Sequence, residues 1–577
     1  MRSRQVRSPE SSDAQRIPRR LFLGGSFKAA IAAGLCSPLS IAGLLGCTAR
    51  QRRYDGELIE PSYETAHRMR DGKLEIPSLT PEGPLHDAIV VGSGISGLMA
   101  AWDLARGGLE DILIYEKEDY PGGHACKGTA NGTDYSRATW SLARPRDRFL
   151  TQILSDLDVI ESIGADGTPK IRPEYVGPPP QQNILIEGQW YRGAAWDGHD
   201  AEQVLPTLPM PERYRRDMLD FTREMLEWPS RKGRDGLPAF AMPVEEASRD
   251  AELLELDRIT MAEYGRRRGW GQQMIEGLDG WSAGMIGGLA SEVSAYAFLS
   301  FNSLGQAGED ITLPGGNAWL AERLVKKVGK NRIRTGIMVV RIENRADEIR
   351  AILLDPRSGR FSMRRARCAV LACPKHITGR MVPEMRTPER LAYRDFKYGA
   401  LLMGTASVRH TPVLEGVELA WSQYAEGTFS DGFMIGDYNS ERWRQGDPRR
   451  PNVLCVYAPL AGKASRAELL EKPWSHWADL MAGDLEFMVP GISEELTRID
   501  INVWAHHMVI PFPGFLTGTH RHAVCRPLGR ITFAHTDRHG MPSFELAARA
   551  GHDAARECAE ILRGSRTTAH TRGMVPT

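Results

Sequence analysis

The sequence predicts an α/β fold that contains a dinucleotide-binding domain, and three neighbouring features predict it. An apolar run over residues 87–91 is typical of a buried parallel strand. A glycine-rich turn, Gly92 to Gly97, follows directly and leads into a helical pattern over residues 98–105. A second apolar run, residues 112–115, ends at Glu116. Strand, glycine turn, helix, strand and acid in this order are typical of a dinucleotide-binding βαβ unit.

Each glycine of the turn has a physical role in such a unit. Gly92 permits a tight turn out of the strand. Gly94 lets a pyrophosphate approach the helix N-terminus, where free N–H groups favour an anion. Gly97 lets helix and strand pack closely, and Glu116 is expected to accept hydrogen bonds from a ribose. The cofactor-binding residues expected here are Gly92, Ser93, Gly94, Ser96, Gly97 and Glu116.

A second glycine pair, Gly122-Gly123, follows soon after Glu116. This spacing resembles the extended fingerprint of two-domain FAD enzymes. The resemblance is to the flavin-containing amine oxidase superfamily, which also includes the phytoene desaturase-like enzymes. It implies FAD as the cofactor and adds Lys117, Gly122, Gly123 and His124 to the expected binding residues.

Three later segments carry the same resemblance. Residues 313–320 look like the family's glycine pair before a helix, and residues 335–342 like a strand whose valine, here Val339, lies near the adenine. Residues 529–534 and 545–551 look like the last strand and the helix that points at the flavin. The resemblance therefore implies a Rossmann-type FAD-binding domain assembled from three chain segments, plus a substrate domain of mixed sheet and helices.

These segments divide the chain into expected domains. Residues 85–142, 309–395 and 521–565 are the three FAD-binding parts, and 143–308 and 396–520 are the two substrate-domain parts. Residues 48–84 are a linker or an arm lying over the first domain, and 566–577 are a tail. Tyr214, Met218, Phe221 and Met225 recur at helical spacing and predict an amphipathic helix. Short strand pairs are expected at 184–186 with 189–191 and at 349–354 with 361–363, and a separate buried strand at 368–373.

The net charge and the spacing of the cysteines argue against a nucleic-acid partner and against a metal site. The 577 residues carry no net charge, so the sequence indicates no nucleic-acid surface. None of the eight cysteines forms a CxxC pair or another metal-ligand spacing, so no metal site is expected.

Residues 1–47 are expected to be a targeting segment rather than part of the fold. Arg19-Arg20-Leu21-Phe22-Leu23 resembles the twin-arginine export signal, and Leu44-Leu45-Gly46-Cys47 resembles a lipobox, with Cys47 as the lipidated residue. We expect an exported protein, periplasmic or associated with the cell envelope. The alternative is an uncleaved membrane anchor, because residues 29–47 carry no charge.

The flavin itself carries out hydride chemistry, so no nucleophile motif is required. Amine oxidases commonly place a lysine near flavin N5. Met403 stands at the aligned position here, and Lys397 is offset from it. This departure argues against the standard oxygen-using amine oxidase mechanism.

The end of the chain departs from the family as well. His535-Thr536-Asp537 replaces the usual Gly-Glu-His-Thr, which makes Asp537 the candidate to bind the ribityl hydroxyls. The pattern is closer to exported spermidine dehydrogenase-like enzymes, whose glycine pair is also followed by His-Ala, as at His124-Ala125.

Trp504, His506 and His507 are the catalytic candidates. The resemblance places a tryptophan near the substrate, and either histidine can act as a base or orient an amine. The alternative is that one histidine is exposed and the other caps a loop.

Together these features predict an exported FAD-dependent oxidoreductase that oxidises a small-molecule amine, a polyamine among the candidates. Hydride transfer to flavin N5 gives an imine, which hydrolyses to an aldehyde. One alternative is a desaturase or isomerase of a polyene or other lipid, and another is a flavoprotein subunit without turnover. The sequence identifies neither the electron acceptor nor the oligomeric state.

Overall fold

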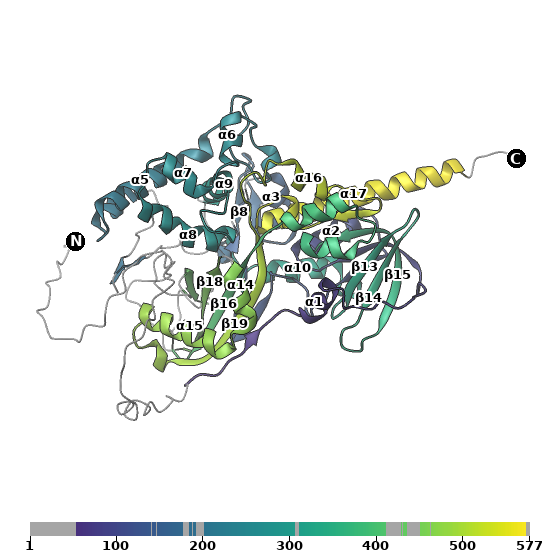
Figure 1. The fold of residues 1–577 in the computed structure, drawn as a ribbon, viewed down its shortest axis with the longest axis horizontal. Coiled ribbons are helices and arrows are strands. Elements are labelled where there is room, and N and C mark those ends of the chain that lie inside the picture. Colours follow the sequence, from purple (N-terminus) through teal and green to yellow (C-terminus); the bar gives the residue numbers. More distant parts are fainter. Residues whose placement is uncertain are drawn as a thin grey trace, which may run out of the picture. The chain divides into compact units, whose positions relative to one another are not determined.

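The computed structural model describes residues 53–572, except 140, 143, 146, 177–183, 187–188, 192–200, 306–310, 411–428, 430, 436–449 and 462. The predicted signal segment, with Arg19, Arg20 and Cys47, therefore lies outside the described residues. Within the described part, no helix is long and apolar enough to cross a membrane. Helices and strands are labelled as in Figure 1.

A sheet of seven described strands has the order β12-β3-β2-β15-β14-β13, and β20 pairs with β15. The strands β12, β3, β2, β15 and β20 run parallel, whereas β13 and β14 extend the sheet as an antiparallel pair. Strands from three distant stretches of the chain therefore share one sheet, although the exact domain boundaries stay a prediction. The strands are β2 Leu85–Val91, β3 Ile112–Tyr115, β12 Ile333–Arg334, β13 Met338–Asn344, β14 Ile349–Leu354, β15 Phe361–Leu371 and β20 Ile531–Phe533.

Strand β15 differs from the prediction, because the sequence predicts two separate strands at 361–363 and 368–373 and the structure has one continuous strand. Its first half pairs antiparallel with β14, and its second half pairs parallel with β2 and β20. Arg364 and Arg365 interrupt the apolar pattern at the crossing point, and Arg364 forms an ion pair with Glu82 at 2.8 Å. The predicted hairpin strand and the predicted buried strand are therefore one strand.

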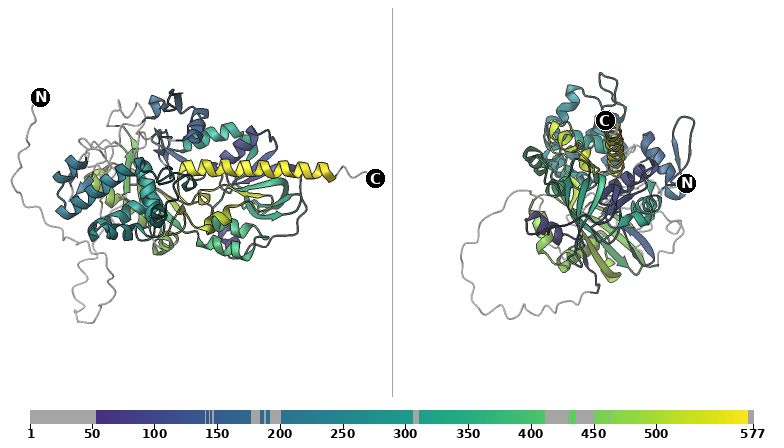
Figure 2. Two further views of the ribbon diagram at one scale, coloured as in Figure 1. Left: turned by 90° about the horizontal axis from the view of Figure 1, so that it is seen from above. Right: turned by 90° about the vertical axis from the view of Figure 1, so that its right-hand side faces the viewer.

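Three helices pack with one face of this sheet: α2 (Ile95–Arg106), α10 (Ala318–Val328) and α17 (Phe544–Arg572). Helices α2 and α17 approach so closely that a Cβ at Gly551 would lie 2.3 Å from the Ser96 carbonyl oxygen. Figures 1 and 2 show α17 as the long yellow helix beside α2 and the sheet. Because side chains alternate along a strand, this core takes every second residue, including Ala88, Val90, Cys368 and Val370.

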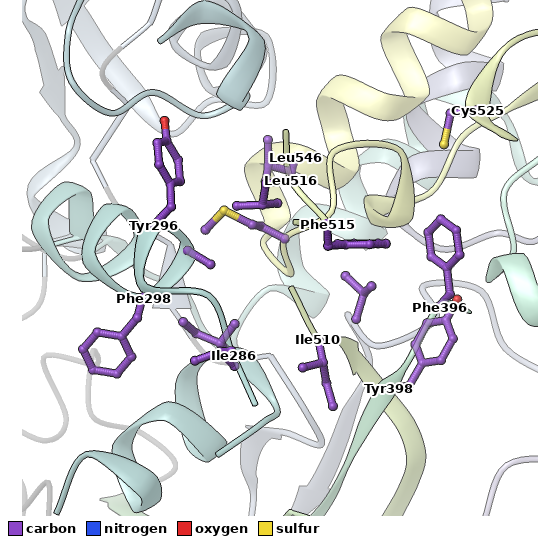
Figure 3. Close-up of a cluster of buried hydrophobic side chains, with 14 of the residues drawn as sticks. Ile286, Tyr296, Phe298, Phe396, Tyr398, Ile510, Phe515, Leu516, Cys525 and Leu546 are labelled. Atoms are coloured by element: carbon purple, nitrogen blue, oxygen red, sulfur yellow. The ribbon is translucent and has the colours of Figure 1, made fainter. Parts of the chain in front are cut away.

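The alternate residues of the same strands pack with a helical region. This region confirms the predicted amphipathic helix as α5, which buries Met218, Phe221 and Met225. Its helices are α4 Ala201–Val204, α5 Glu212–Glu227, α6 Ala251–Leu256, α7 Met261–Arg267, α8 Gln272–Ile286 and α9 Ala295–Gly305. Figure 3 shows part of this core, in which Ile286, Tyr296 and Phe298 of α8 and α9 join Phe396, Tyr398, Ile510, Phe515, Leu516, Cys525 and Leu546.

A second sheet has the order β1-β19-β16-β18-β17. Helix α15 (Trp474–Met488) packs on it through the buried Trp477 and Met481, and α14 (Lys463–Glu471) lies beside β19. The strands are β1 Leu58–Ile59, β16 Tyr398–Val408, β17 Asp431–Ile435, β18 Asn452–Leu460 and β19 Leu496–Val509. Strand β16 is buried along its whole length, so this sheet has a hydrophobic interior of its own.

Residues 53–84, within the segment expected to be a linker or an arm over the first domain, carry regular structure and contact both sheets. Strand β1 pairs with β19, and α1 (Glu64–Arg70) follows it. Met69, Leu74, Ile76 and Leu79 then pack on buried residues of β13, β14 and β15. We call residues 53–84 the strap.

The remaining described elements are short. The predicted strand pair at 184–191 forms as β9 and β10, in antiparallel register. The elements are β4 Lys127–Ala130, β5 Thr133–Ser136, β6 Ser141–Leu142, α3 Arg148–Asp156, β7 Ile160–Ile163, β8 Pro169–Ile171, β9 Ile184–Ile186, β10 Gln189–Tyr191, β11 Ile311–Thr312, α11 Lys375–Met381, α12 Thr387–Ala392, α16 Thr519–Cys525 and the 3-10 turn η8 Thr536–Arg538.

Candidate active site

The glycine turn after β2 lies against the second glycine pair. Gly94 and Gly122 form a parallel bridge, and the Gly122 N–H donates to the Ser93 carbonyl at 3.0 Å. Gly123 has a φ of +60°, and a Cβ there would lie 3.1 Å from the Gly94 Cα. The structure thus brings the two glycine motifs together, although they are separated in the sequence by a helix and a strand.

Gly97 and Gly94 differ in what a side chain would meet. A Cβ at Gly97 would lie 2.0 Å from the Gly92 carbonyl oxygen, so the turn requires glycine there. A Cβ at Gly94 would have its nearest neighbours, in Gly122 and Gly123, at 4.0 Å. Space is therefore open above Gly94, at the N-terminus of α2, where a pyrophosphate can approach the backbone.

Glu116, the predicted ribose ligand, holds the glycine turn. Its Oε2 accepts hydrogen bonds from the Ser93 N–H at 2.8 Å and from the Ser93 hydroxyl at 2.9 Å. Its Oε1 accepts from the Glu118 N–H at 3.0 Å. A carboxylate has about four acceptor positions, so one remains for a ribose hydroxyl. The sequence predicts only the ribose contact, because Ser93 pairing requires the folded turn.

The other expected adenosine contacts lie next to Glu116. The Ile337 N–H donates to the Glu116 carbonyl at 2.9 Å, which places the start of β13 and the buried Val339 nearby. Lys117 forms an ion pair with Glu118 and donates to the Ser62 carbonyl of the strap at 3.1 Å. The strap therefore reaches this end of the site.

A bulge in β19 separates the side chains of the two predicted histidines. Leu401 pairs with Trp504 and Gly399 with Met508, so three residues of β19 face one residue of β16. Bulges commonly re-aim side chains next to active sites. Both histidines lie within the strand, and each packs against a different aromatic group.

His507 and Trp504 contact His124, the residue after the second glycine pair. The His124 ring centroid lies 4.8 Å from that of His507 and 4.8 Å from that of Trp504. Trp504 is held in place because its indole N–H donates to the Arg137 carbonyl at 2.8 Å. The predicted cofactor residue and two predicted catalytic residues therefore lie together.

His506 instead stacks on His376, a residue that sequence reasoning missed. Their ring centroids are 4.5 Å apart with an interplanar angle of 22°, and the Tyr398 ring lies 4.8 Å from His376. The hydroxyl of Tyr398 donates to Asp537 Oδ2 at 2.5 Å, and the Lys375 N–H donates to the same oxygen at 2.8 Å. We call His124, His376, Tyr398, Trp504, His506 and His507 the ring cluster.

Burial keeps the histidines of the ring cluster neutral. It lowers the pKa of His376 to about 3, and those of His506 and His507 to about 4. It also holds the pKa of His124 well below its ordinary value. The positive charge of Arg466 adds to the shift at His506 and His376.

Asp537 is the carboxylate next to these rings. Burial would raise its pKa, but His535 at 3.0 Å and the two hydrogen bonds to Oδ2 lower it below its ordinary value. The Nδ1 atoms of His376 and His507 are buried and have no hydrogen-bond partner among the described residues. Buried polar atoms are usually paired, so each of these two nitrogens can form a hydrogen bond with a bound molecule.

Neither residue considered for the family lysine supplies an amine to the ring cluster. Met403 is fully buried against Tyr135, Val453 and Cys455, and Lys397 is exposed, with its ammonium 5.1 Å from the Phe512 ring. The fully buried Lys375 is a different case. Its ammonium donates to the Val524 carbonyl at 3.1 Å, and burial lowers its pKa. Within the described residues, no group of histidines, cysteines and carboxylates could hold a metal ion.

Two family models match the sequence. Residues 90–148 match the NAD(P)-binding Rossmann-like domain, and residues 174–559 match the flavin containing amine oxidoreductase family. The second match covers more than half of the chain. The protein belongs to the flavin-containing amine oxidoreductase family. It is an FAD-dependent oxidoreductase, as the sequence predicts.

Solved structures agree with the fold of this flavoenzyme. A variant of putrescine oxidase is 16% identical with a TM-score of 0.61, and its whole length matches 83% of this chain. Cyclohexylamine oxidase from Brevibacterium oxydans is 18% identical with a TM-score of 0.60 and the same coverage. The CLA-producing fatty acid isomerase from P. acnes is 14% identical with a TM-score of 0.57, covering 82% of this chain and 98% of its own. No curated protein sequence matches.

FAD fits the arrangement of these residues. The space at Gly94 suits the pyrophosphate, the predicted adenosine contacts Glu116 and Val339 lie near each other, and His124 leads into the ring cluster. Asp537 stays the predicted ribityl ligand. The individual assignments remain predictions that substitutions can test.

Proposed function

We propose that this flavoenzyme oxidises a small-molecule amine that it binds in its uncharged form. The observation that carries the proposal is the ring cluster, in which desolvation lowers the pKa of four half-buried histidines. The ring cluster adjoins the second glycine pair through His124. Aromatic faces and imidazole nitrogens therefore surround the position where an amine would meet the flavin.

The charges around the ring cluster favour the deprotonated amine. Burial and the nearby positive charges that lower the histidine pKa values also disfavour a bound ammonium ion. A neutral amine donates hydride far more readily than an ammonium ion does. The orphan nitrogens of His376 and His507 can accept hydrogen bonds from the amine N–H groups.

The bound FAD supplies the hydride acceptor. On the substrate, the C–H bond next to nitrogen breaks, the nitrogen loses a proton, and a carbon–nitrogen double bond forms. Water then hydrolyses this imine to a carbonyl compound and ammonia or a smaller amine. Trp504 and His124 can orient the reacting carbon, because the Arg137 carbonyl fixes the indole and packing fixes both rings.

Anaerobic mixing of the holoenzyme with substrates tests this function. Primary and secondary amines should bleach the flavin absorbance band, and polyene fatty acids should leave it unchanged. Failure of every amine to reduce the flavin would refute the proposal. Reduction by a polyene alone would instead favour the desaturase or isomerase.

We further propose export through the twin-arginine pathway, with Cys47 as the lipid attachment site. The support is the Arg19-Arg20 pair and the Leu44-Leu45-Gly46-Cys47 sequence. Replacing both arginines by lysine should leave the protein in the cytoplasmic fraction with FAD bound. Unchanged export of that variant would contradict the proposal.

A further inference from the structure

Arg466 is a partly buried cation with no carboxylate partner among the described residues. It lies on α14, and its guanidinium donates to the backbone carbonyl of Tyr398. Its Nε is buried and has no hydrogen-bond partner in the described part of the chain. Burial lowers its pKa, and no carboxylate among the described residues counters this shift.

Two other arginines near the site, the buried Arg521 and the half-buried Arg538, are paired with carboxylates. Arg521 forms an ion pair with Glu245 at 2.8 Å, and Arg538 forms one with Glu557 at 2.7 Å. Taking a charge out of water without a partner is costly. This contrast indicates that the guanidinium of Arg466 is left available to bind a carboxylate that is not part of the protein.

Arg466 stands at the ring cluster. Its hydrogen-bond acceptor, Tyr398, has its ring 6.0 Å from that of His506 and 4.8 Å from that of His376. The charge of Arg466 acts on both histidines. Arg70 of the strap adds positive charge at His506, whereas Asp537 already accepts two hydrogen bonds through one oxygen.

We propose that Arg466 binds a carboxylate of the substrate, so that the substrate is an amine that also carries a carboxylate, such as an amino acid. This inference rests on the proposed function, because it assumes that the amine reacts at the ring cluster. A guanidinium presents a planar fork of N–H donors that matches a carboxylate, and such charge-assisted pairs are strong. A polyamine would instead place a second cation beside Arg466.

Matched substrate pairs test the inference. Leucine is compared with isoamylamine, and aminocaproate with hexylamine and hexamethylenediamine, in anaerobic flavin reduction by the holoenzyme. At least one carboxylate-bearing amine should reduce the flavin about tenfold more efficiently than its uncharged analogue. Arg466→Met should abolish this preference, so that the carboxylate-bearing amine and its uncharged analogue reduce the flavin with efficiencies that agree within about twofold. Arg466→Lys keeps the positive charge but loses the planar fork of N–H donors, so it should retain part of the preference for the carboxylate-bearing amine.

The control variant is Arg234→Met, because Arg234 is exposed and paired with Glu252. It should keep the wild-type preference. Flavin content and thermal unfolding of each variant separate misfolding from lost recognition. No preference in the wild type, or the same preference in Arg466→Met, would overturn the inference.

A second readout does not need turnover. Octanoate alone should shift the flavin absorbance spectrum of the wild type, with weaker binding by about tenfold or more in Arg466→Met. If no amine reduces the flavin but this difference is seen, the proposed function fails and the carboxylate site stands. Equal binding of octanoate to both proteins would refute the carboxylate site.

Discussion

The glycine turn and the ring cluster are two halves of one site that are built in different ways. The turn is set by backbone geometry within a single βαβ unit, where Gly97 fits against the Gly92 carbonyl. The ring cluster joins residues from four distant parts of the chain, and burial sets its chemistry. We therefore expect steric substitutions to abolish FAD binding at the glycine turn. Changes in charge and pH should instead alter the reactivity of the ring cluster.

The largest effect is expected from Gly97→Ala. A Cβ 2.0 Å from a backbone oxygen forces the turn to move, so we expect a loss of roughly 4 kcal/mol of stability and no bound FAD. Urea unfolding and flavin content measure both. The control is Gly280→Ala in α8, where a Cβ meets nothing within 4 Å and alanine should stabilise by about 0.5–1 kcal/mol. Normal FAD binding by Gly97→Ala would show that the turn is less constrained than described.

Gly94→Val should separate cofactor binding from folding. Gly94 has a φ of −65°, which any residue adopts, and its Cβ would point into open space. The apoprotein should therefore keep its stability within about 1 kcal/mol. FAD affinity, measured by quenching of flavin fluorescence, should fall on the order of a hundredfold, or about 2.7 kcal/mol, because the side chain fills the pyrophosphate position. If Gly94→Val binds FAD with wild-type affinity, the pyrophosphate does not lie at Gly94.

His376→Gln should reduce the sensitivity of the apoprotein to acid. The folded pKa of His376 is about 3, whereas the unfolded value is about 6.5. Between these values the unfolded chain binds more protons, so stability falls as the pH drops from about 6.5 towards 3. Glutamine does not titrate, so the loss between pH 7 and pH 4 should shrink by roughly 3 kcal/mol. Urea unfolding at both pH values checks this, and an unchanged loss would mean that His376 is not desolvated.

Ser62→Ala should have the smallest effect. The Ser62 hydroxyl donates to Glu118 at 2.9 Å, but this contact is exposed and the Ser62 N–H also donates to Glu118. We expect FAD affinity to change by less than about threefold, since exposed hydrogen bonds add well under 1 kcal/mol. A larger loss in an FAD titration would give the strap a direct role in holding the adenosine end.

The two halves also differ in how far the sequence predicts them. Local patterns locate β2, α2 and β3, because glycine spacing and apolar runs report on neighbouring residues. They miss His376 and Arg466, since a lone histidine after Pro374 and a lone arginine on a helix have no local signature. The polar composition of residues 53–84 leaves a linker and an arm over the first domain both open, whereas the pairing of β1 with β19 is not visible in the sequence. Strand β15 is divided in the prediction because its arginines lie where it changes partners.

The most direct test of the account is the pH dependence of anaerobic flavin reduction by a single amine. The ring cluster should stay neutral above about pH 5, so the rate constant should rise with pH towards the amine's own pKa, near 10. No inflection should appear near pH 6.5, where an ordinary histidine titrates. An inflection near 6.5 that disappears in His506→Gln would contradict the account, because it would show a histidine that is hydrated and changes its charge during turnover.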